Sequence, residues 1–444
     1  MLGKIATFEM GQAPPGTECN KDGKGTLFVK AGEFGKLYPE QKEWTTRPLK
    51  FGKRGDVFIC VVGATAGKLN LGIDCAIGRS VAAIRPNHDI DTRFVYYQLQ
   101  PFVLKLRSSS SGSAQGVISK QQLHEIPFRL VDLDKQREMV AEIEKQFSRL
   151  DEAVALLKRA KTNLKRYKAS VLKAAVEGKL TEDWRKQHPD VEPASKLLER
   201  TLAERRAKRA QKKDGFLAAD GAPPADSPDG WTICSIDQIA ECLDAKRVPV
   251  NKTERAKRGG SIPYYGANGQ VGVIDDYIFD EPLVLVVEDE TFTGRTQAFS
   301  YLIRGKAWVN NHAHVLRATS ALKVNYLNYA LAHYPFTPRT TGSTGRRKLT
   351  QKGLMTAPFL LPSLAEQNQI VSEVERRLSV IDELEATVEA NLTRADRLRQ
   401  SILSETFSGR LMRQGTKNIP DNVTAFSLAA ESPAKYGKDV RTGR

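Results

Sequence analysis

The chain has 444 residues, 40% of them hydrophobic and 27% charged, and its 68 Lys and Arg outnumber 52 Asp and Glu to give a net charge of +16. This length predicts about two to four domains, and the positive charge favours a polyanionic partner, nucleic acid first and an acidic membrane second. Five cysteines without a C-x-x-C pair argue against a disulfide framework or a zinc ribbon. The longest apolar run, residues 283–287, is too short to cross a bilayer, and the first residues lack a signal-peptide pattern, so we expect a cytoplasmic protein.

The first part of the chain predicts a mixed α+β globule. Short apolar runs separated by glycines predict strands at residues 57–62 and 81–84, with a glycine turn at 63–67 between them. A helix is expected over residues 91–106, followed by a polar serine-rich loop.

One long stretch of the sequence occurs twice. Residues 118–180 align without a gap on residues 349–411 at an offset of 231, so that Leu123 falls on Leu354 and Gln136 on Gln367. Chance would not preserve one register over so many residues, and we interpret the repeat as an internal duplication.

Each copy predicts a long helix with an apolar seam. The spacing alternates between three and four residues over about five heptads, which favours a coiled-coil face over a helix lying on a globular core. The seam residues are Val140, Ile143, Phe147, Leu150, Val154, Leu157, Leu164 and Val171 in the first copy, and Val371, Val374, Leu378, Ile381, Val388, Leu392 and Ile402 in the second. Because both seams belong to one chain, we expect them to pair with each other; the alternative left open is that they also dock partner helices. Gly178 and Gly409 stand where glycine commonly ends a helix.

The remaining segments complete a repeated plan. A basic stretch at 199–213 is either a solvated helix face or a contact to a nucleic-acid backbone, and a Pro/Gly/Ala-rich linker follows. Strands are expected at 283–287 and 308–316 and a helix at 324–333. We predict a first globule at residues 1–134, a central helical region at 135–215, a linker at 216–230, a second globule at 231–365, a second helical region at 366–412 and a disordered tail at 413–444.

No catalytic constellation emerges from the motifs. The segment from Gly63 to Lys68 resembles a phosphate-binding loop but is one residue short and lacks the following Ser or Thr, which favours a plain glycine turn. Glu288 and its acidic neighbours end an apolar strand and fit a polar loop better than a metal site. His312 and His314 would alternate on one face of a strand, where packing, DNA contact or metal ligation are open alternatives.

Several motifs together resemble the specificity subunit of type I restriction–modification enzymes. They are Tyr-Tyr-Gly-Ala-Asn-Gly at 264–269, Val-Asn-Asn-His-Ala-His-Val-Leu at 309–316, Leu-Pro at 361–362 followed by Glu-Gln at 366–367, and Gly-Lys-Leu-Thr-Glu-Asp-Trp-Arg at 178–185. The resemblance implies an α+β fold in which two target-recognition domains alternate with two long helices that pair as an antiparallel coiled coil, a pseudo-two-fold internal repeat. Two departures stand out: the second globule begins at Trp231 whereas the first has no such tryptophan, and Lys135 stands where the second copy has Glu366.

The resemblance also implies the function. Each globule would read one half of a split, asymmetric double-stranded DNA site, and the helices would set the unread gap and bind two methyltransferase subunits. Restriction subunits would complete the complex. This chain would be non-catalytic and without a cofactor, whereas its partners would use S-adenosylmethionine, ATP and Mg²⁺.

The candidate DNA-binding residues are chosen by position, because Lys and Arg contact phosphates and polar side chains read base edges. They are Lys68, Arg79, Arg107, Ser109, Ser111, Ser113 and Gln115 in the first half, and Arg295, His312, His314, Arg339, Ser343, Arg346 and Arg347 in the second. Two other hypotheses remain open. A coiled-coil assembly scaffold would bind partners without selecting a DNA sequence, and a self-sufficient methyltransferase or nuclease would be active alone.

Overall fold

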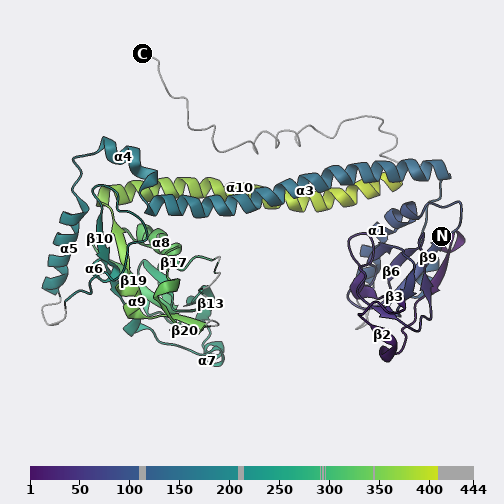
Figure 1. The fold of residues 1–444 in the computed structure, drawn as a ribbon, viewed down its shortest axis with the longest axis horizontal. Helices are drawn as coiled ribbons and strands as arrows, with labels where there is room; N and C mark the ends of the chain where they lie inside the picture. The colour runs from purple at the N-terminus through teal and green to yellow at the C-terminus, as the bar shows by residue number, and fades with distance from the viewer. Residues whose placement is uncertain are drawn as a thin grey trace, which may run out of the picture. The chain divides into compact units, whose positions relative to one another are not determined.

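The computed structural model describes residues 1–109, 117–208, 215–290, 292, 295, 297–343 and 346–408. It contains two compact units (Figure 1), one formed by residues 1–160 with the described residues from Val388 onward, the other by residues 161–387. Each unit holds one globule and one part of each long helix, α3 (Leu133–Val176) and α10 (Leu364–Ser408). The predicted tail at 413–444 lies outside the described residues.

The first globule is built on two small sheets. An antiparallel sheet has the order β1-β9-β6-β7, and a second sheet has the order β2-β4-β3-β8-β5, in which β3 and β8 run parallel. The strands are β1 (Ala6–Met10), β2 (Cys19–Asn20), β3 (Thr26–Val29), β4 (Trp44–Thr45), β5 (Phe51–Gly52), β6 (Val57–Cys60), β7 (Leu69–Leu71), β8 (Cys75–Ile77) and β9 (Val81–Pro86).

The second globule repeats this topology. Its sheets have the orders β11-β19-β15-β17 and β13-β12-β18-β14, and again one pair of the second sheet, β12 and β18, is parallel. The strands are β11 (Ala240–Cys242), β12 (Ile262–Gly266), β13 (Gly269–Ile274), β14 (Phe279–Asp280), β15 (Leu283–Val287), β17 (Ser300–Ile303), β18 (Lys306–Val309) and β19 (Ala313–Ala318). The matching order shows that the globules, and not only the helices, are copies of one unit.

Helices cover these sheets, and smaller elements complete the globules. The equivalent helices α1 and α8 pack on β6 and β7 and on β15 and β17 respectively. The helices are α1 (Thr92–Ser109), α2 (Lys120–His124), α4 (Glu182–Gln187), α5 (Ala194–Lys208), α6 (Ile236–Ile239), α7 (Lys252–Lys257), α8 (Val324–Ala332) and α9 (Gln351–Met355). The further strands are β10 (Thr232–Ser235), β16 (Asp289–Glu290), β20 (Thr340–Ser343), β21 (Arg346–Leu349) and β22 (Pro358–Leu361).

The expected strands and helices are confirmed, with one exception. The prediction of a single strand over residues 308–316 is wrong, because the segment forms β18 and β19 with a turn at Asn310–His312 between them. The Oδ1 atom of Asn310 accepts a hydrogen bond from the backbone N–H of His312 at 2.8 Å, which closes this turn. His312 therefore lies in the turn, whereas His314 lies in β19, and the two do not share a strand face.

The two long helices pair in an antiparallel manner within each unit. In the first unit Ile143 and Phe147 of α3 share a core with Ile402 of α10, and in the second Val171 of α3 shares a core with Val374 of α10. Every residue of the predicted seams is buried or half-buried.

An ion pair marks the symmetry of this pairing. Asp151 of α3 pairs with Arg399 of α10 in the first unit, and Asp382 of α10 pairs with Lys168 of α3 at 2.9 Å in the second. The repeat offset of 231 converts Asp151 into Asp382 and Lys168 into Arg399. The same acidic and basic positions thus meet in both units, which confirms the antiparallel pairing of the helices in each unit.

A buried glutamine fastens each globule to the helix that follows it. The Oε1 atom of Gln136 accepts from the N–H of Asp91, just before α1, at 2.8 Å, and its Nε2 atom donates to the Val131 carbonyl. Gln367 repeats this clamp with the N–H of Lys323, just before α8, at 2.8 Å. The conformation of each globule is therefore tied to the first turn of a long helix.

The two departures between the repeats have one structural explanation. Glu366 is buried and accepts hydrogen bonds from Trp231 Nε1 at 2.8 Å and Thr181 Oγ1 at 2.7 Å, and it also pairs with Arg185. Since the first copy has no equivalent of Trp231, a carboxylate at position 135 would lack this indole donor, and the half-buried Lys135 stands there instead.

Two further sequence expectations fall on described residues. Gly178 follows α3 with a φ of 69°, in the left-handed region that ends helices. In the basic stretch, Arg205 donates to the carbonyl oxygens of Asp237 and Ala240 on the second globule, so at least this side chain supports the fold rather than facing solvent. Among the described residues, no helix is both long and apolar enough to span a membrane.

Candidate nucleic-acid interface

A group of polar side chains gathers around the turn between β18 and β19. The exposed His312 places its Nδ1 atom 2.7 Å from a carboxylate oxygen of Asp289, the first residue of β16. Asn310, in the same turn, lies beside Gly266, where an added Cβ would come within 3.2 Å of its amide nitrogen. The glycine in the Tyr-Tyr-Gly-Ala-Asn-Gly motif therefore lets the β12–β13 hairpin approach this turn.

The group continues onto that hairpin. Arg295 donates to the side-chain oxygen of Asn268, in the β12–β13 turn, at 2.6 Å and to the Ala298 carbonyl at 2.9 Å, and its guanidinium lies over the Phe299 ring. We name Asn268, Asp289, Arg295, Asn310 and His312 the recognition ridge. Amide and guanidinium groups are among the side chains that pair with base edges in DNA grooves.

A basic hairpin formed by β20 and β21 borders the recognition ridge. β21 pairs with both β20 and β16, and Lys348 lies opposite Asp289 in the register. Arg347 donates from Nε to Thr340 Oγ1 at 2.7 Å, which orders its side chain across the hairpin. The Lys348 side chain is 57% exposed and its ammonium lies 2.9 Å from a carboxylate oxygen of Glu288.

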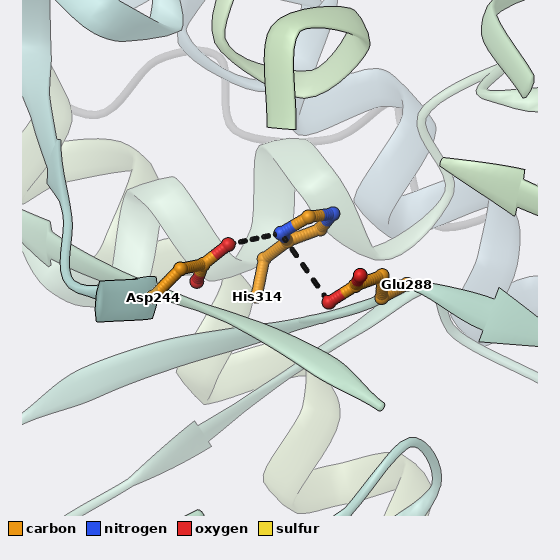
Figure 2. Close-up of side chains that lie close together, drawn as sticks. All are labelled: Asp244, Glu288 and His314. Carbon is orange, nitrogen blue, oxygen red and sulfur yellow. Dashed lines mark hydrogen bonds and ion pairs between the residues drawn. The ribbon is translucent and has the colours of Figure 1, made fainter. Parts of the chain in front are cut away.

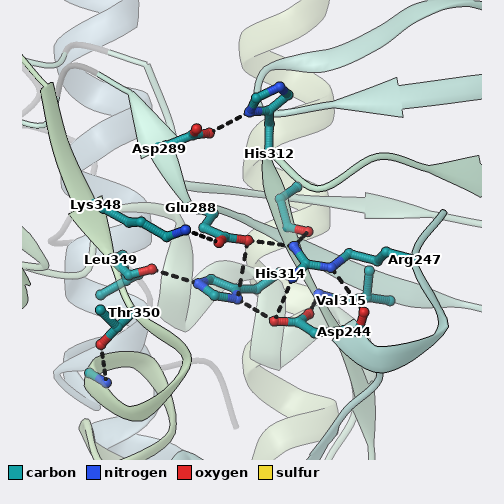
Figure 3. A network of polar contacts seen from close by, with 12 residues as sticks. Asp244, Arg247, Glu288, Asp289, His312, His314, Val315, Lys348, Leu349 and Thr350 are labelled. Atoms are coloured by element: carbon teal, nitrogen blue, oxygen red, sulfur yellow. Dashed lines mark hydrogen bonds and ion pairs between the residues drawn. The ribbon is translucent and has the colours of Figure 1, made fainter. Parts of the chain in front are cut away.

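A buried ionic network, three side chains of which are drawn in Figure 2, contacts the hairpin at Lys348 and Leu349. His314 is 1% exposed, and its Nδ1 atom lies 2.6 Å from Asp244 and 3.9 Å from Glu288. The Nε2 atom of His314 is 2.8 Å from the Leu349 carbonyl oxygen, and Arg247 pairs with both acids (Figure 3). Both ring nitrogens therefore face oxygen atoms that accept hydrogen bonds, and the imidazole is held from both sides.

The network keeps its acids ionised. Burial by itself would raise the pKa of Asp244, but the hydrogen bond and charge of His314 lower that pKa below its ordinary value. For Glu288 burial again acts upward, and hydrogen bonds from Arg247 and Lys348 lower the pKa overall. Both carboxyl groups are therefore charged near neutral pH.

The same residues do not form a convincing metal site. Ligand atoms of Asp244, Glu288 and His314 lie within 4.8 Å of one another. However, Arg247 and Lys348 already pair with these carboxylates, and both imidazole nitrogens are engaged. Positive charge that a metal ion would bring is thus supplied by side chains.

Two turns of the first globule correspond to the segments that form the recognition ridge. They are the glycine turn between β6 and β7 and the turn before β9. The segment from Gly63 to Lys68 connects two antiparallel strands, β6 and β7, instead of leading from a strand into a helix as a phosphate-binding loop does. Lys68 donates to the Phe34 carbonyl and is half-buried, whereas Arg79 is exposed in the turn before β9. Arg79 thus lies where the second globule has the turn of His312.

The structure separates the candidate DNA-binding residues into groups. It brings Arg295, His312 and Arg347 toward the recognition ridge and hairpin. The prediction that His314 contacts DNA is contradicted by its burial. Arg339 donates to the carbonyls of Gly353 and Asp220 and to Thr356 Oγ1, contacts that secure the fold.

The other candidates cannot be placed to the level of side-chain contacts. Arg107 and Ser109 belong to α1, and Ser343 and Arg346 to the basic hairpin, but their side chains are not among those described. Ser111, Ser113 and Gln115 lie outside the described residues. The sequence search missed Asn268, Asn310 and Lys348, although the first two stand in motifs that carried the resemblance.

These observations define a class of protein, a tandemly duplicated recognition protein with paired long helices, and comparisons identify the family. A family model described as the type I restriction modification DNA specificity domain matches residues 2–166 and 228–394. The chain therefore belongs to the family of type I restriction–modification specificity subunits.

Individual relatives agree with this assignment. The EcoDI specificity subunit of Escherichia coli is 25% identical over 364 residues, which cover 77% of this chain and 75% of the relative. The StySPI specificity subunit of Salmonella potsdam is 24% identical over 377 residues, covering 83% and 76% respectively. A chain from a structural study of assembly and conformational transition in the type I R-M system shares the fold, with a TM-score of 0.63, 16% identity and coverage of 92% of this chain and 97% of that chain.

Proposed function

We propose that this chain supplies the sequence recognition of a type I restriction–modification complex, with each globule reading one half of a bipartite, asymmetric DNA site. The observation that carries the proposal is the duplication of a whole globule combined with different polar surfaces on the two copies. Two globules that share one fold but differ in their polar surfaces suit a DNA site whose two halves differ in sequence.

The recognition ridge is the proposed reader of the second half-site. Its amide and imidazole groups would contact base edges in the major groove, while Arg347 and Lys348 would contact phosphates. In the first globule we assign the corresponding role to the turn that carries Arg79. Phosphate contacts would provide most of the affinity, and base contacts the selectivity.

The paired helices are the proposed docking surface for two methyltransferase subunits. Besides the seam, they expose large apolar side chains, among them Tyr167 and Leu398, which are 44% and 41% exposed. These two residues are related by the repeat offset of 231, so the helices present one apolar position twice. Two copies of one partner fit such a repeated surface.

The chemistry would belong to the partners. We propose that methyltransferase subunits bring S-adenosylmethionine and that restriction subunits use ATP and Mg²⁺, while this chain is non-catalytic. A cytoplasmic location suits this assembly and stays a prediction.

The decisive test is co-expression with a methyltransferase subunit of the same system, followed by mapping of methylated sites in host DNA. We expect methylation at a split motif with a fixed gap, and we expect Arg79→Ala and His312→Ala to relax opposite halves of that motif. A stable complex that methylates no defined motif would favour the alternative of an assembly scaffold. Methylation by this chain alone would contradict the non-catalytic assignment.

A further inference from the structure

Among the described residues of the first globule, the positions equivalent to three members of the ionic network carry apolar side chains. Leu349 donates its N–H to the Glu288 carbonyl at 2.8 Å, and Ile118 donates to Val61 at the same distance, so Val61 corresponds to Glu288. In the second globule His314 of β19 lies opposite Val286 of β15, and in the first globule Ala82 of β9 lies opposite Ile59 of β6. Ala82 is therefore the equivalent of His314. The repeat offset places Val117 where the second copy has Lys348.

This difference indicates that the network is not needed to stabilise the sheet. Val61 and Ala82 are buried in the main core of the first globule, so the two strand positions equivalent to Glu288 and His314 need no charge for the sheet to form. Buried ion pairs are seldom more stabilising than apolar packing of equal volume, and their best-attested benefit is that they select one arrangement. A geometric role therefore explains the network better than stability alone.

The arrangement that it selects is that of the basic hairpin. Lys348 is held by Glu288, and Leu349 is held on both sides, its N–H by the Glu288 carbonyl and its carbonyl oxygen by His314 Nε2. Arg247 joins the network to the Ala313 carbonyl at 2.8 Å, directly after the turn of the recognition ridge. The hairpin and the ridge are thus anchored to one set of charges.

We propose that Glu288 is a positioning residue for DNA recognition: through Arg247, His314 and Lys348 it holds the basic hairpin in register with the recognition ridge, and it does so only in the second globule. The proposal rests on the proposed function, since it concerns the reader of one half-site. Its consequence is an asymmetry between the two readers, because the first globule has Val61 and Ala82 at the positions equivalent to Glu288 and His314.

The test compares Glu288→Gln with Glu281→Gln in the full chain, assembled with its methyltransferase subunits. Glutamine keeps the shape of Glu288 but removes its charge. Glu281 is the matched control, because it pairs with Arg317 near the other end of β15 and makes no contact with the network. Two quantities are measured, the hydrogen exchange of the amides of β20 and β21 and the methylated motif.

We expect Glu288→Gln to speed hairpin amide exchange by about tenfold or more, since hydrogen bonds to a charged group are lost. The half-motif that relaxes should be the one changed by His312→Ala, while the half changed by Arg79→Ala stays intact. Glu281→Gln should alter neither quantity. Unchanged hairpin exchange, or equal relaxation of both halves, would overturn the proposal.

A second pair of variants, at Lys348, keeps the proposal testable if Glu288→Gln does not fold. Lys348 is mostly exposed, so Lys348→Met should fold; it should speed hairpin exchange, and Lys348→Arg should restore protection. No difference between these two variants would count against the network as the anchor. If the wild-type complex methylates no split motif, the proposed function fails, yet the exchange measurements still decide whether Glu288 positions the hairpin.

Discussion

At the scale of single residues, buried polar side chains connect the parts of each unit. Gln136 and Gln367 are nearly inaccessible to solvent and hydrogen-bond the backbone just before α1 and α8. A buried backbone group that loses its partner bears the full cost of desolvation, so removing one of these hydrogen bonds should lower the free energy of unfolding.

Replacing either clamp with alanine should destabilise its unit. We expect Gln136→Ala and Gln367→Ala each to lower the free energy of unfolding by about 1–3 kcal/mol, measured by chemical denaturation. Gln121→Ala serves as the control, because that side chain is exposed and donates a hydrogen bond to the neighbouring exposed Glu125, just after α2. Equal effects of all three substitutions would show that the clamp contacts contribute nothing specific.

The charge of Glu288 should make the stability of the chain depend on pH. Because the pKa of Glu288 is lower in the folded chain than its ordinary value, its contribution to stability is complete above about pH 4–5 and disappears as the pH falls through the folded-state pKa. The difference in unfolding free energy between wild type and Glu288→Gln should therefore be largest near pH 6 and shrink toward pH 3. A difference that does not depend on pH would contradict the charged state assigned to Glu288.

At the scale of elements, the long helices carry two kinds of apolar position. Ile381 faces the seam and is 1% exposed, whereas Leu384, three residues further along α10, is 47% exposed. One helix therefore stabilises the unit with one face and leaves apolar surface on another, which is the surface assigned to partners.

Alanine substitutions at these positions should separate stability from assembly. Ile381→Ala should lower the free energy of unfolding by about 2–5 kcal/mol, because it opens a cavity in a packed seam. Leu384→Ala should change it by no more than about 0.5 kcal/mol but weaken methyltransferase binding, measured by calorimetry. Strong destabilisation by Leu384→Ala would mean that this face already has a partner within the chain.

At the scale of the whole molecule, each long helix passes from one compact unit into the other. α3 crosses the boundary near Ala160 and α10 near Thr387. Helix length is therefore a parameter that the sequence sets independently of both globules, as is required if the helices set the unread gap of the DNA site.

Inserting one heptad into both helices at this boundary should keep the seam in register while lengthening each by about 10 Å. The gap in the methylated motif should then grow by about three base pairs, at 3.4 Å per pair, and methylation mapping would reveal it. Insertion into α3 alone should prevent the Asp151–Arg399 and Lys168–Asp382 pairs from forming together, and so impair assembly. An unchanged gap after the paired insertion would reject the proposal that the helices set the gap of the DNA site.

The sequence by itself determined the duplication, the long helices and the strands at the centre of each globule. These features follow from local periodicity and from a register preserved between the two copies, both of which can be read along the chain. Motif order also sufficed for the family. The sequence did not reveal that the segment at 308–316 breaks into two strands, because a side chain of Asn310 closes a turn inside an otherwise strand-like run.

Only the tertiary structure decided what the polar residues do. His312 and His314 are two positions apart, yet one is exposed in a turn and the other is buried with acids from two other segments. The recognition ridge likewise combines residues from separate hairpins and turns. Such groups form because sheet pairing brings distant strand ends together, and a buried charge can persist only where the fold supplies its partners.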